Sequence, residues 1–276
     1  MTRLRAPSVV LASRARRLVV IPIGGAVMYL ALRLIVRDPE ATLWVRRLVP
    51  TCFLLLAVAG SALAAARLEA GDYLRPGWIL LGADYLLLVG TTWLRTFEPT
   101  PAVASARLAS IVALNVCQVA VAWRLARAWR VAGLQLPSRR TPVYVAAAVL
   151  ALVAVGPALY LGLRDAIQTG AIVSWNGLIS GLGDGTTFLL IAPIALTAWS
   201  LRGGVTVWPW LFFTLQLLCW LTYDAQDTLI LLVMPEATTV PTWLQIAVEP
   251  LRVAAAGFAF AAGLSQRWIS GQEVTS

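Results

Sequence analysis

Eight long apolar segments alternate with short polar connections along the chain. Each segment approaches the ~20 residues that a helix needs to cross a ~30 Å hydrocarbon layer. Because lipid offers the backbone no hydrogen-bond partners, every such segment is expected to be helical. The pattern predicts an all-α, polytopic integral membrane protein with eight transmembrane helices. The segments cover residues 18–36, 48–66, 78–95, 107–128, 142–163, 184–201, 208–233 and 243–264.

A faint internal repeat divides the eight segments into two sets of four. The first segment ends in YLALR (29–33) and the fifth ends in YLGLR (160–164). Residues 65–90 and 198–224 share an arginine at a segment end, a glycine-bearing turn and a proline near tryptophan. A four-segment unit gives both copies the same orientation, so the sequence predicts a parallel 4+4 tandem repeat. Chance similarity between apolar segments is the alternative.

The repeat and the charged stretches together predict how the chain is organised. The basic start lacks a following small-residue cleavage site, so it is expected to remain as a cytoplasmic arm. The basic linker between the halves is the best candidate for docking a separate protein, with contact to lipid headgroups as the alternative. The longest outer connection, 164–183, is expected to form an interfacial helix or a re-entrant segment. The predicted parts are the arm (1–17), the first four-helix half (18–128), the linker (129–141), the second half (142–264) and a short tail (265–276).

Composition strengthens the membrane prediction and sets an orientation. Hydrophobic residues make up 59% of the chain and charged residues only 13%, whereas a soluble domain has about 25% charged residues. The net charge is +9, and every positively charged side chain is an arginine. These arginines concentrate on one side of the alternating segments, which predicts that both termini lie on the cytoplasmic side of the inner membrane. Their position beside apolar segments indicates lipid headgroups as partners, and no nucleic acid.

Missing residue types exclude several kinds of chemistry. Without lysine there is no internal Schiff base, so the sequence does not fit a retinal-binding protein. Without histidine there is no imidazole base, no haem-ligating histidine and no histidine metal site. Cys52, Cys117 and Cys219 lie in separate apolar segments and are expected to be small buried side chains. We therefore expect no enzyme activity, no cofactor and no metal site.

Acidic residues near one end of the last three segments form the main candidate site. Asp224 and Asp227 lie three positions apart in WLTYDAQDTL (220–229), so they share one helix face. Asp184 is expected to open the sixth segment at the same level, where the helix N-terminus favours an acid. The sequence therefore predicts a polar, acidic cavity near the outer face. Its candidate residues are Asp184, Trp220, Tyr223, Asp224, Asp227, Gln245, Glu249 and Arg252.

Two interpretations of this candidate cavity remain open at the level of sequence. In the first, its carboxylates receive a cation, protons or a hydrogen-bonding ligand, because ionisable groups within a membrane often mark function. In the second, Arg252 pairs with Asp224 or Glu249, and the ion pair only holds helices together. In the first case, Asp224→Asn and Glu249→Gln are expected to change the response without loss of folded protein.

Asp84 is a further intramembrane acid, on the third apolar segment. It is expected about 9 Å from the inner surface at helical rise. A structural pair with Arg124 or Arg127 is favoured over a role in handling protons.

The stretch 183–229 carries features that go beyond apolar character. A Gly-Asp pair opens a segment, a short turn follows, tryptophans mark the entry to the next segment, and an aspartate lies near its end. This pattern resembles the multi-span membrane sensory modules of bacterial histidine kinases and diguanylate cyclases. The resemblance implies a membrane sensor but brings no ligand with it. Such sensors continue into a soluble output domain, so we expect this chain to report through a separate partner or an oligomer. The residues that carry the resemblance are Gly183, Asp184, Trp208, Trp210 and Asp224.

Three classes of function follow from the sequence. The leading prediction is a non-enzymatic membrane module for sensing or partner binding. A small-solute, cation or proton transporter is the second class, which a repeat architecture would suit. The third is a structural subunit of a larger membrane complex, which needs no site.

Overall fold

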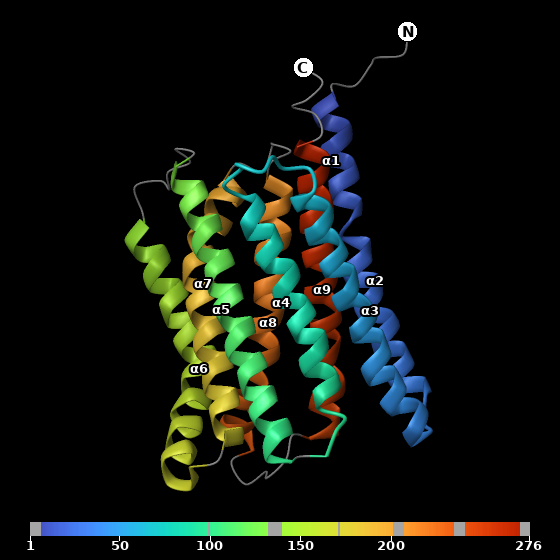
Figure 1. Ribbon diagram of the computed structural model, residues 1–276, viewed down its shortest axis with the longest axis vertical. Helices are drawn as coiled ribbons and strands as arrows, with labels where there is room; N and C mark the ends of the chain where they lie inside the picture. The colour runs from blue at the N-terminus through green and yellow to red at the C-terminus, as the bar shows by residue number, and fades with distance from the viewer. Residues whose placement is uncertain are drawn as a thin grey trace.

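The computed structural model describes residues 7–98, 100–131, 140–170, 172–200, 207–234 and 241–270. Within these ranges the chain forms nine α-helices and no β-strand, so the all-α prediction is confirmed (Figure 1). The helices are α1 (Pro7–Arg17), α2 (Val20–Ile35), α3 (Pro39–Ala65), α4 (Arg75–Leu94), α5 (Pro101–Val131), α6 (Arg140–Thr169), α7 (Ile172–Ser200), α8 (Val207–Val233) and α9 (Thr242–Ser270).

Each predicted apolar segment overlaps one of the long helices α2 to α9. Six helical stretches of the described residues are long and apolar enough to cross a membrane. This is compatible with a multi-pass membrane protein. The count of eight crossings and the tandem repeat remain predictions. The six stretches are Ala12–Ile35, Pro39–Ala65, Arg75–Leu94, Pro101–Val131, Tyr144–Thr169 and Thr242–Ser270.

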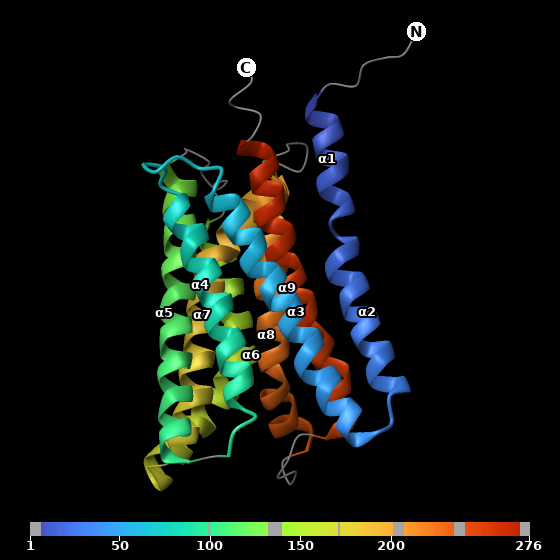
Figure 2. The ribbon, with the colours of Figure 1, turned by 45° about the vertical axis from the view of Figure 1, so that its right-hand side comes forward.

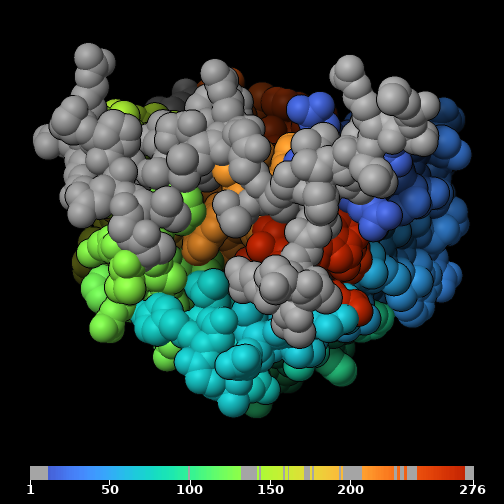
Figure 3. Space-filling model, turned by 90° about the horizontal axis from the view of Figure 1, so that it is seen from above, coloured from blue at the N-terminus to red at the C-terminus, as the bar shows by residue number. Residues whose placement is uncertain are grey.

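Helix α9 is the centre around which much of the bundle is arranged. In its most apolar window 67% of the residues are buried, against at most 44% in the other five candidate spans. It packs against α2, α3 and α8, while α4 packs between α3 and α5, and α7 contacts α5, α6 and α8. Figure 3 shows α9 between α3, α4 and α8 at the end where α1 begins. Helices α1 and α2 run in the same direction, and from α2 to α9 the described helices alternate, so α1 begins and α9 ends at the same end (Figure 1).

Glycines allow α3 and α9 to approach closely. A Cβ added to Gly60 would lie 2.8 Å from the backbone Cα and oxygen of Phe260. A Cβ added to Gly263 would overlap the backbone of Gly60 itself. Small residues at such crossings bring backbones together and increase van der Waals contact where lipid provides no hydrophobic driving force. The α3–α9 crossing therefore depends on these glycines.

Helix α2 lies at one side of the bundle and is held mainly by α9. It packs closely on α9 but has few contacts with α3, and Figure 2 shows α1 and α2 set apart from the other helices. A Cβ on Gly257 of α9 would lie 2.7 Å from the Cα of Pro22. The outward face of α2 is apolar and exposed, as at Val20 and Ile35, which fits contact with lipid.

The predicted outer connection over 164–183 is wrong. Helix α6 continues to Thr169 and α7 begins at Ile172, so most of this stretch is helical. The turn lies at Gly170, whose φ of +64° is unfavourable for residues with a side chain. Gly181 and Gly183 allow close packing instead, since a Cβ on Gly181 would lie 2.8 Å from a Val155 methyl and one on Gly183 would overlap Asn115. The sequence alone had placed this glycine-rich stretch in a connection.

Several predicted parts extend outside the described residues. The basic arm is helical from Pro7, but residues 1–6 are not described. Most of the predicted docking linker, residues 132–139, is also outside the described ranges. The tail is described only to Ser270, where α9 ends.

Candidate functional site

Asp184 lies in the middle of α7 rather than at a helix start. It follows Ile172 by twelve positions, which corresponds to about 18 Å of helix. Gln118 of α5 donates a hydrogen bond from Nε2 to Asp184 Oδ1 at 2.9 Å, and both side chains are buried. The predicted position of Asp184 at an outer helix N-terminus is therefore wrong, because the helix begins well before its glycines.

Asp84 is the second buried acid at this level. It lies nine residues into α4, about 14 Å from the helix start, and is 4% exposed. It interacts electrostatically with Asp184, and its Oδ1 atom has no hydrogen-bond partner among the described residues. The two carboxylates, on α4 and α7, are therefore close enough to interact electrostatically.

The favoured pairing of Asp84 with an arginine of α5 is wrong. The guanidinium groups of Arg124 and Arg127 instead lie 5.4 and 5.7 Å from the centre of the Tyr73 ring. The Cβ of Arg124 is level with Gly77, seven residues before Asp84 and about 10 Å away along α4. Long arginine side chains turn toward the polar end of a helix, which separates them from the buried acid.

Two further polar side chains complete what we call the central polar cluster: Asp84, Asn115, Gln118, Asp184 and Thr187. Asn115 of α5 donates from Nδ2 to the Ile111 carbonyl at 2.8 Å, and its Oδ1 lies against Gly183. Any side chain at Gly183 would overlap that oxygen. Thr187 follows Asp184 by three positions on the same face of α7 and is fully buried.

Aromatic and amide groups of α8 lie beside this cluster. Trp220 donates from Nε1 to the hydroxyl of Tyr85 at 3.4 Å, and Tyr85 directly follows Asp84. Gln216 lies one turn before Trp220 and is 1% exposed, with no partner for its Oε1 atom among the described residues. Trp220 was predicted to line the outer cavity, and the structure places it beside the central acids through Tyr85.

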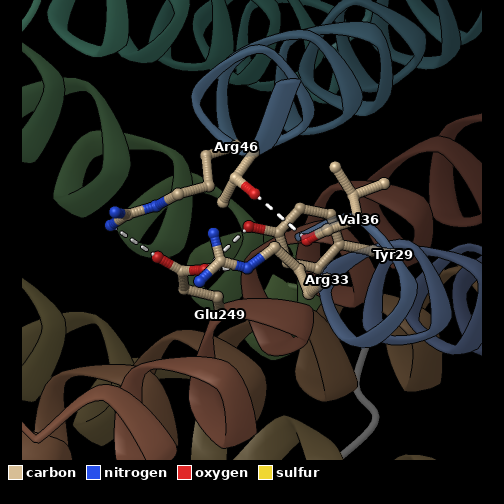
Figure 4. Close-up of polar contacts among 6 residues, drawn as sticks. Tyr29, Arg33, Val36, Arg46 and Glu249 are labelled. Carbon is tan, nitrogen blue, oxygen red and sulfur yellow. Dashed lines mark hydrogen bonds and ion pairs between the residues drawn. The ribbon is translucent and has the colours of Figure 1, made fainter. Parts of the chain in front are cut away.

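Glu249 belongs to a separate group of ionic contacts, called the outer ion cluster because its end of the bundle is the one predicted to be outer (Figure 4). Its carboxylate accepts a hydrogen bond from the Tyr29 hydroxyl at 2.8 Å. It also pairs with Arg46 Nη2 at 2.8 Å and with Arg33 Nε at 3.5 Å. Glu249, Tyr29 and Arg33 are buried, while Arg46 reaches the surface. The outer ion cluster therefore joins α2, α3 and α9.

Arg252 was predicted to pair with Asp224 or Glu249. The ion pairs of Glu249 are instead with Arg33 and Arg46, and the pairing with Asp224 remains a prediction. The Nη2 atom of Arg252 donates to the hydroxyl of Thr92 at 3.3 Å. Its guanidinium also lies 5.6 Å from the centre of the Tyr223 ring, which in turn meets Trp220 edge-on at 6.0 Å. Arg252 thus links α9 to α4 and α8.

The remaining members of the predicted cavity are less closely defined. Asp224 and Gln245 are partly buried, and each takes part in at least one interaction. The side chain of Asp227 lies outside the described residues. An outer cavity that includes these three remains a prediction.

The acidic residues and the cysteines are the side chains relevant to metal binding. Within the described part of the chain, no group of three or more His, Cys, Asp or Glu is arranged to hold a metal ion. The three cysteines are free, and Cys52 is exposed on the outside of the bundle. The expectation that all three are buried is therefore wrong for Cys52, because an apolar surface that faces lipid does not require burial in protein.

Sequence reasoning missed Tyr29, Arg33 and Arg46 as partners of Glu249, and Asn115, Gln118 and Thr187 as members of the central polar cluster. YLALR held a signal, because Tyr29 and Arg33 are four apart and share a helix face. A second signal for the central polar cluster was the presence of polar residues inside apolar segments: Asn115 and Gln118 in the fourth and Thr187 in the sixth.

The fold and the sites define a class: an all-α protein with multiple membrane-compatible helices and a buried polar centre. Comparison with family models, with curated proteins and with solved structures gives no match.

Proposed function

We propose that this protein is a non-enzymatic, eight-span membrane module that senses a small ligand, with the central polar cluster as its ligand site. The observation that carries the proposal is that two buried acids, Asp84 of α4 and Asp184 of α7, interact electrostatically, and that Asp184 is held by Gln118 of α5. Two ionised carboxylates in such surroundings repel each other and lose hydration. Binding of a positively charged ligand offsets both the repulsion and the lost hydration. The ligand-bound state therefore favours closer packing of the helices that carry the two acids.

A path from this cluster to one end of the bundle supports a sensing role. Helix α5 carries Gln118 in the cluster and Trp129 near the end where α1 begins. Trp129 meets Trp210 of α8 edge-on, with 5.0 Å between ring centres. A shift of α5 is transmitted to α8 at this contact, beside the basic linker. A separate partner or a second copy of the chain would read that change at the cytoplasmic end.

Cysteine labelling tests the proposed topology. In a variant whose three native cysteines are replaced by alanine, Gly71→Cys and Glu98→Cys place single thiols at opposite ends of α4. Both positions are exposed. We expect a membrane-impermeant maleimide to label residue 98 in intact cells and residue 71 only after permeabilisation. Labelling of both from the same side would contradict the assignment of α4 as a span.

Hydrogen exchange tests the link between the central acids and the bundle end. Asp184→Asn removes one charge with almost no change in shape, and mimics neutralisation by a ligand. We expect backbone amides near residues 123–131 to become more protected in nanodiscs by about 10-fold, because α5 packs more closely once the repulsion is gone.

Glu98→Gln provides the matched control, since it neutralises an exposed acid at the end of α4. It is expected to leave exchange in α5 unchanged. If Asp184→Asn changes exchange only in its own helix, the cluster is a local structural feature and the sensing proposal fails.

Transport of a small cation is the second candidate function. It is favoured by the location of Asp84 and Asp184 on helices from the two predicted halves, since transporter sites lie at the interface of repeats near the midplane. Proteoliposomes distinguish the candidates: a transporter gives cation flux that Asp84→Asn abolishes, whereas a sensor gives no flux above empty vesicles.

A further inference from the structure

The central polar cluster contains buried oxygen atoms that no donor satisfies. Within the described residues, Asp84 Oδ1, Asn115 Oδ1 and Thr187 Oγ1 have no hydrogen-bond partner. The three side chains are at most 5% exposed, so bulk water does not reach them. Buried polar atoms without partners are costly, and native proteins keep few of them. A positively charged occupant would satisfy these oxygen atoms and the two acids together.

Thr187, like Thr51, keeps a buried hydroxyl without a hydrogen-bond partner among the described residues, whereas three other buried threonines do not. Thr91, Thr92 and Thr214 each donate their hydroxyl to the backbone carbonyl four residues earlier, at 2.8–2.9 Å. Thr187 makes no such bond, although it lies inside α7. Its oxygen remains available on the helix face that carries Asp184.

Asn115 adds an amide oxygen to the carboxylate and hydroxyl oxygens of the central polar cluster. Its amide nitrogen is occupied by the Ile111 carbonyl, which leaves the amide oxygen as the available atom. That oxygen lies against Gly183, the residue directly before Asp184. The absence of a side chain at Gly183 is what gives it room.

We propose that the central polar cluster binds a dehydrated Na⁺ ion through oxygen atoms of Asp84, Asn115, Asp184 and Thr187. The inference rests on the proposed function and names the ligand of its site. Carboxylate, amide and hydroxyl oxygens are the ligands of hard cations. One Na⁺ and one proton neutralise the two carboxylates.

Thermal unfolding of the purified full chain in detergent tests this site at constant pH and ionic strength. Replacing choline chloride by NaCl is expected to raise the Tm of the wild type by about 5 °C, with saturation at high Na⁺. Asp84→Asn is expected to raise the Tm in choline, because one buried charge is gone, and to abolish the response to Na⁺. Thr187→Val keeps the shape and is expected to weaken Na⁺ binding by more than about 10-fold.

Controls and direct binding make the test decisive. Glu98→Gln is expected to respond to Na⁺ as the wild type does. Radioactive ²²Na⁺ should bind the wild type with one ion per chain, and unlabelled K⁺ should displace it only weakly. The site would be overturned if the wild type had the same Tm in NaCl as in choline chloride. It would also be overturned if NaCl changed the Tm of the wild type and of Asp84→Asn equally. A larger shift with CaCl₂ or MgCl₂ would overturn the assignment to a singly charged ion.

Together, ²²Na⁺ binding and hydrogen exchange distinguish failure of the Na⁺ site from failure of the proposed sensing function. If ²²Na⁺ does not bind while Asp184→Asn still protects α5 from exchange, Na⁺ is the wrong ligand and the sensing site stands. If Na⁺ binds while Asp184→Asn leaves α5 exchange unchanged, the cation site is upheld and the sensing proposal is overturned.

Discussion

Gly263→Val is expected to abolish the folded protein. A Cβ at this position would overlap the backbone of Gly60, and it would lie 3.0 Å from the Ser61 nitrogen. Backbone atoms have no alternative rotamer, so relief requires α3 and α9 to separate along their length. We expect a loss of more than about 3 kcal/mol in the free energy of unfolding, enough to remove most folded protein. Size-exclusion chromatography and Tm of the detergent-solubilised protein measure this directly.

Gly90→Val is the matched control for that substitution. It makes the same change inside a helix, but nothing lies within 4 Å of a Cβ at Gly90, whose surface is exposed. It is expected to fold with nearly unchanged Tm. Equal behaviour of the two variants would show that α3 and α9 are not as close as the structure places them.

Glu249→Gln is expected to destabilise the protein by about 3–5 kcal/mol. The carboxylate holds Arg33 and Arg46 and accepts the Tyr29 hydroxyl, and Arg33 is almost fully buried. Removing one partner of a buried ion pair leaves an uncompensated charge, which is the costly case. Thermal unfolding should show a large fall in Tm. In a hydrogen-exchange experiment the backbone amides of α2 should exchange first, because Glu249 makes main polar contacts between α2 and α9.

A double variant separates this structural role from ligand binding. Arg33→Leu combined with Glu249→Leu removes both buried charges, and Arg46 reaches water through its exposed side chain. It is expected to be more stable than Glu249→Gln, since apolar replacement of a buried pair is often neutral. If Glu249→Gln keeps the wild-type Tm, Glu249 is available for a ligand instead, as the first interpretation of the sequence held.

The two acids that looked alike in the sequence have different surroundings in the structure. Glu249 is neutralised by two arginines, whereas Asp184 interacts with another acid and, among the described residues, accepts a hydrogen bond from the Gln118 amide. The predicted single cavity therefore divides into an outer ion cluster and a central polar cluster. Along the chain, Asp184 had been placed at the start of the sixth segment, because the glycine-rich stretch before it was assigned to a connection, whereas it lies inside α7.

The helical, membrane-compatible character followed from the sequence alone. An apolar run of this length without charged surface has a single solution in lipid, because only a helix satisfies its backbone internally. Periodicity also placed Tyr29 with Arg33 and Asp184 with Thr187 on common faces, since i, i+3 and i, i+4 spacing is local geometry.

The partners of those faces were decided only by the tertiary structure. Whether Glu249 meets Arg252 or Arg33 depends on which helices cross and how far each is shifted along its axis. Those quantities are set by small contacts such as Gly60 with Gly263 and Gly257 with Pro22. Hydropathy is insensitive to them, because moving a helix by one turn keeps its apolar face apolar while exchanging every polar partner.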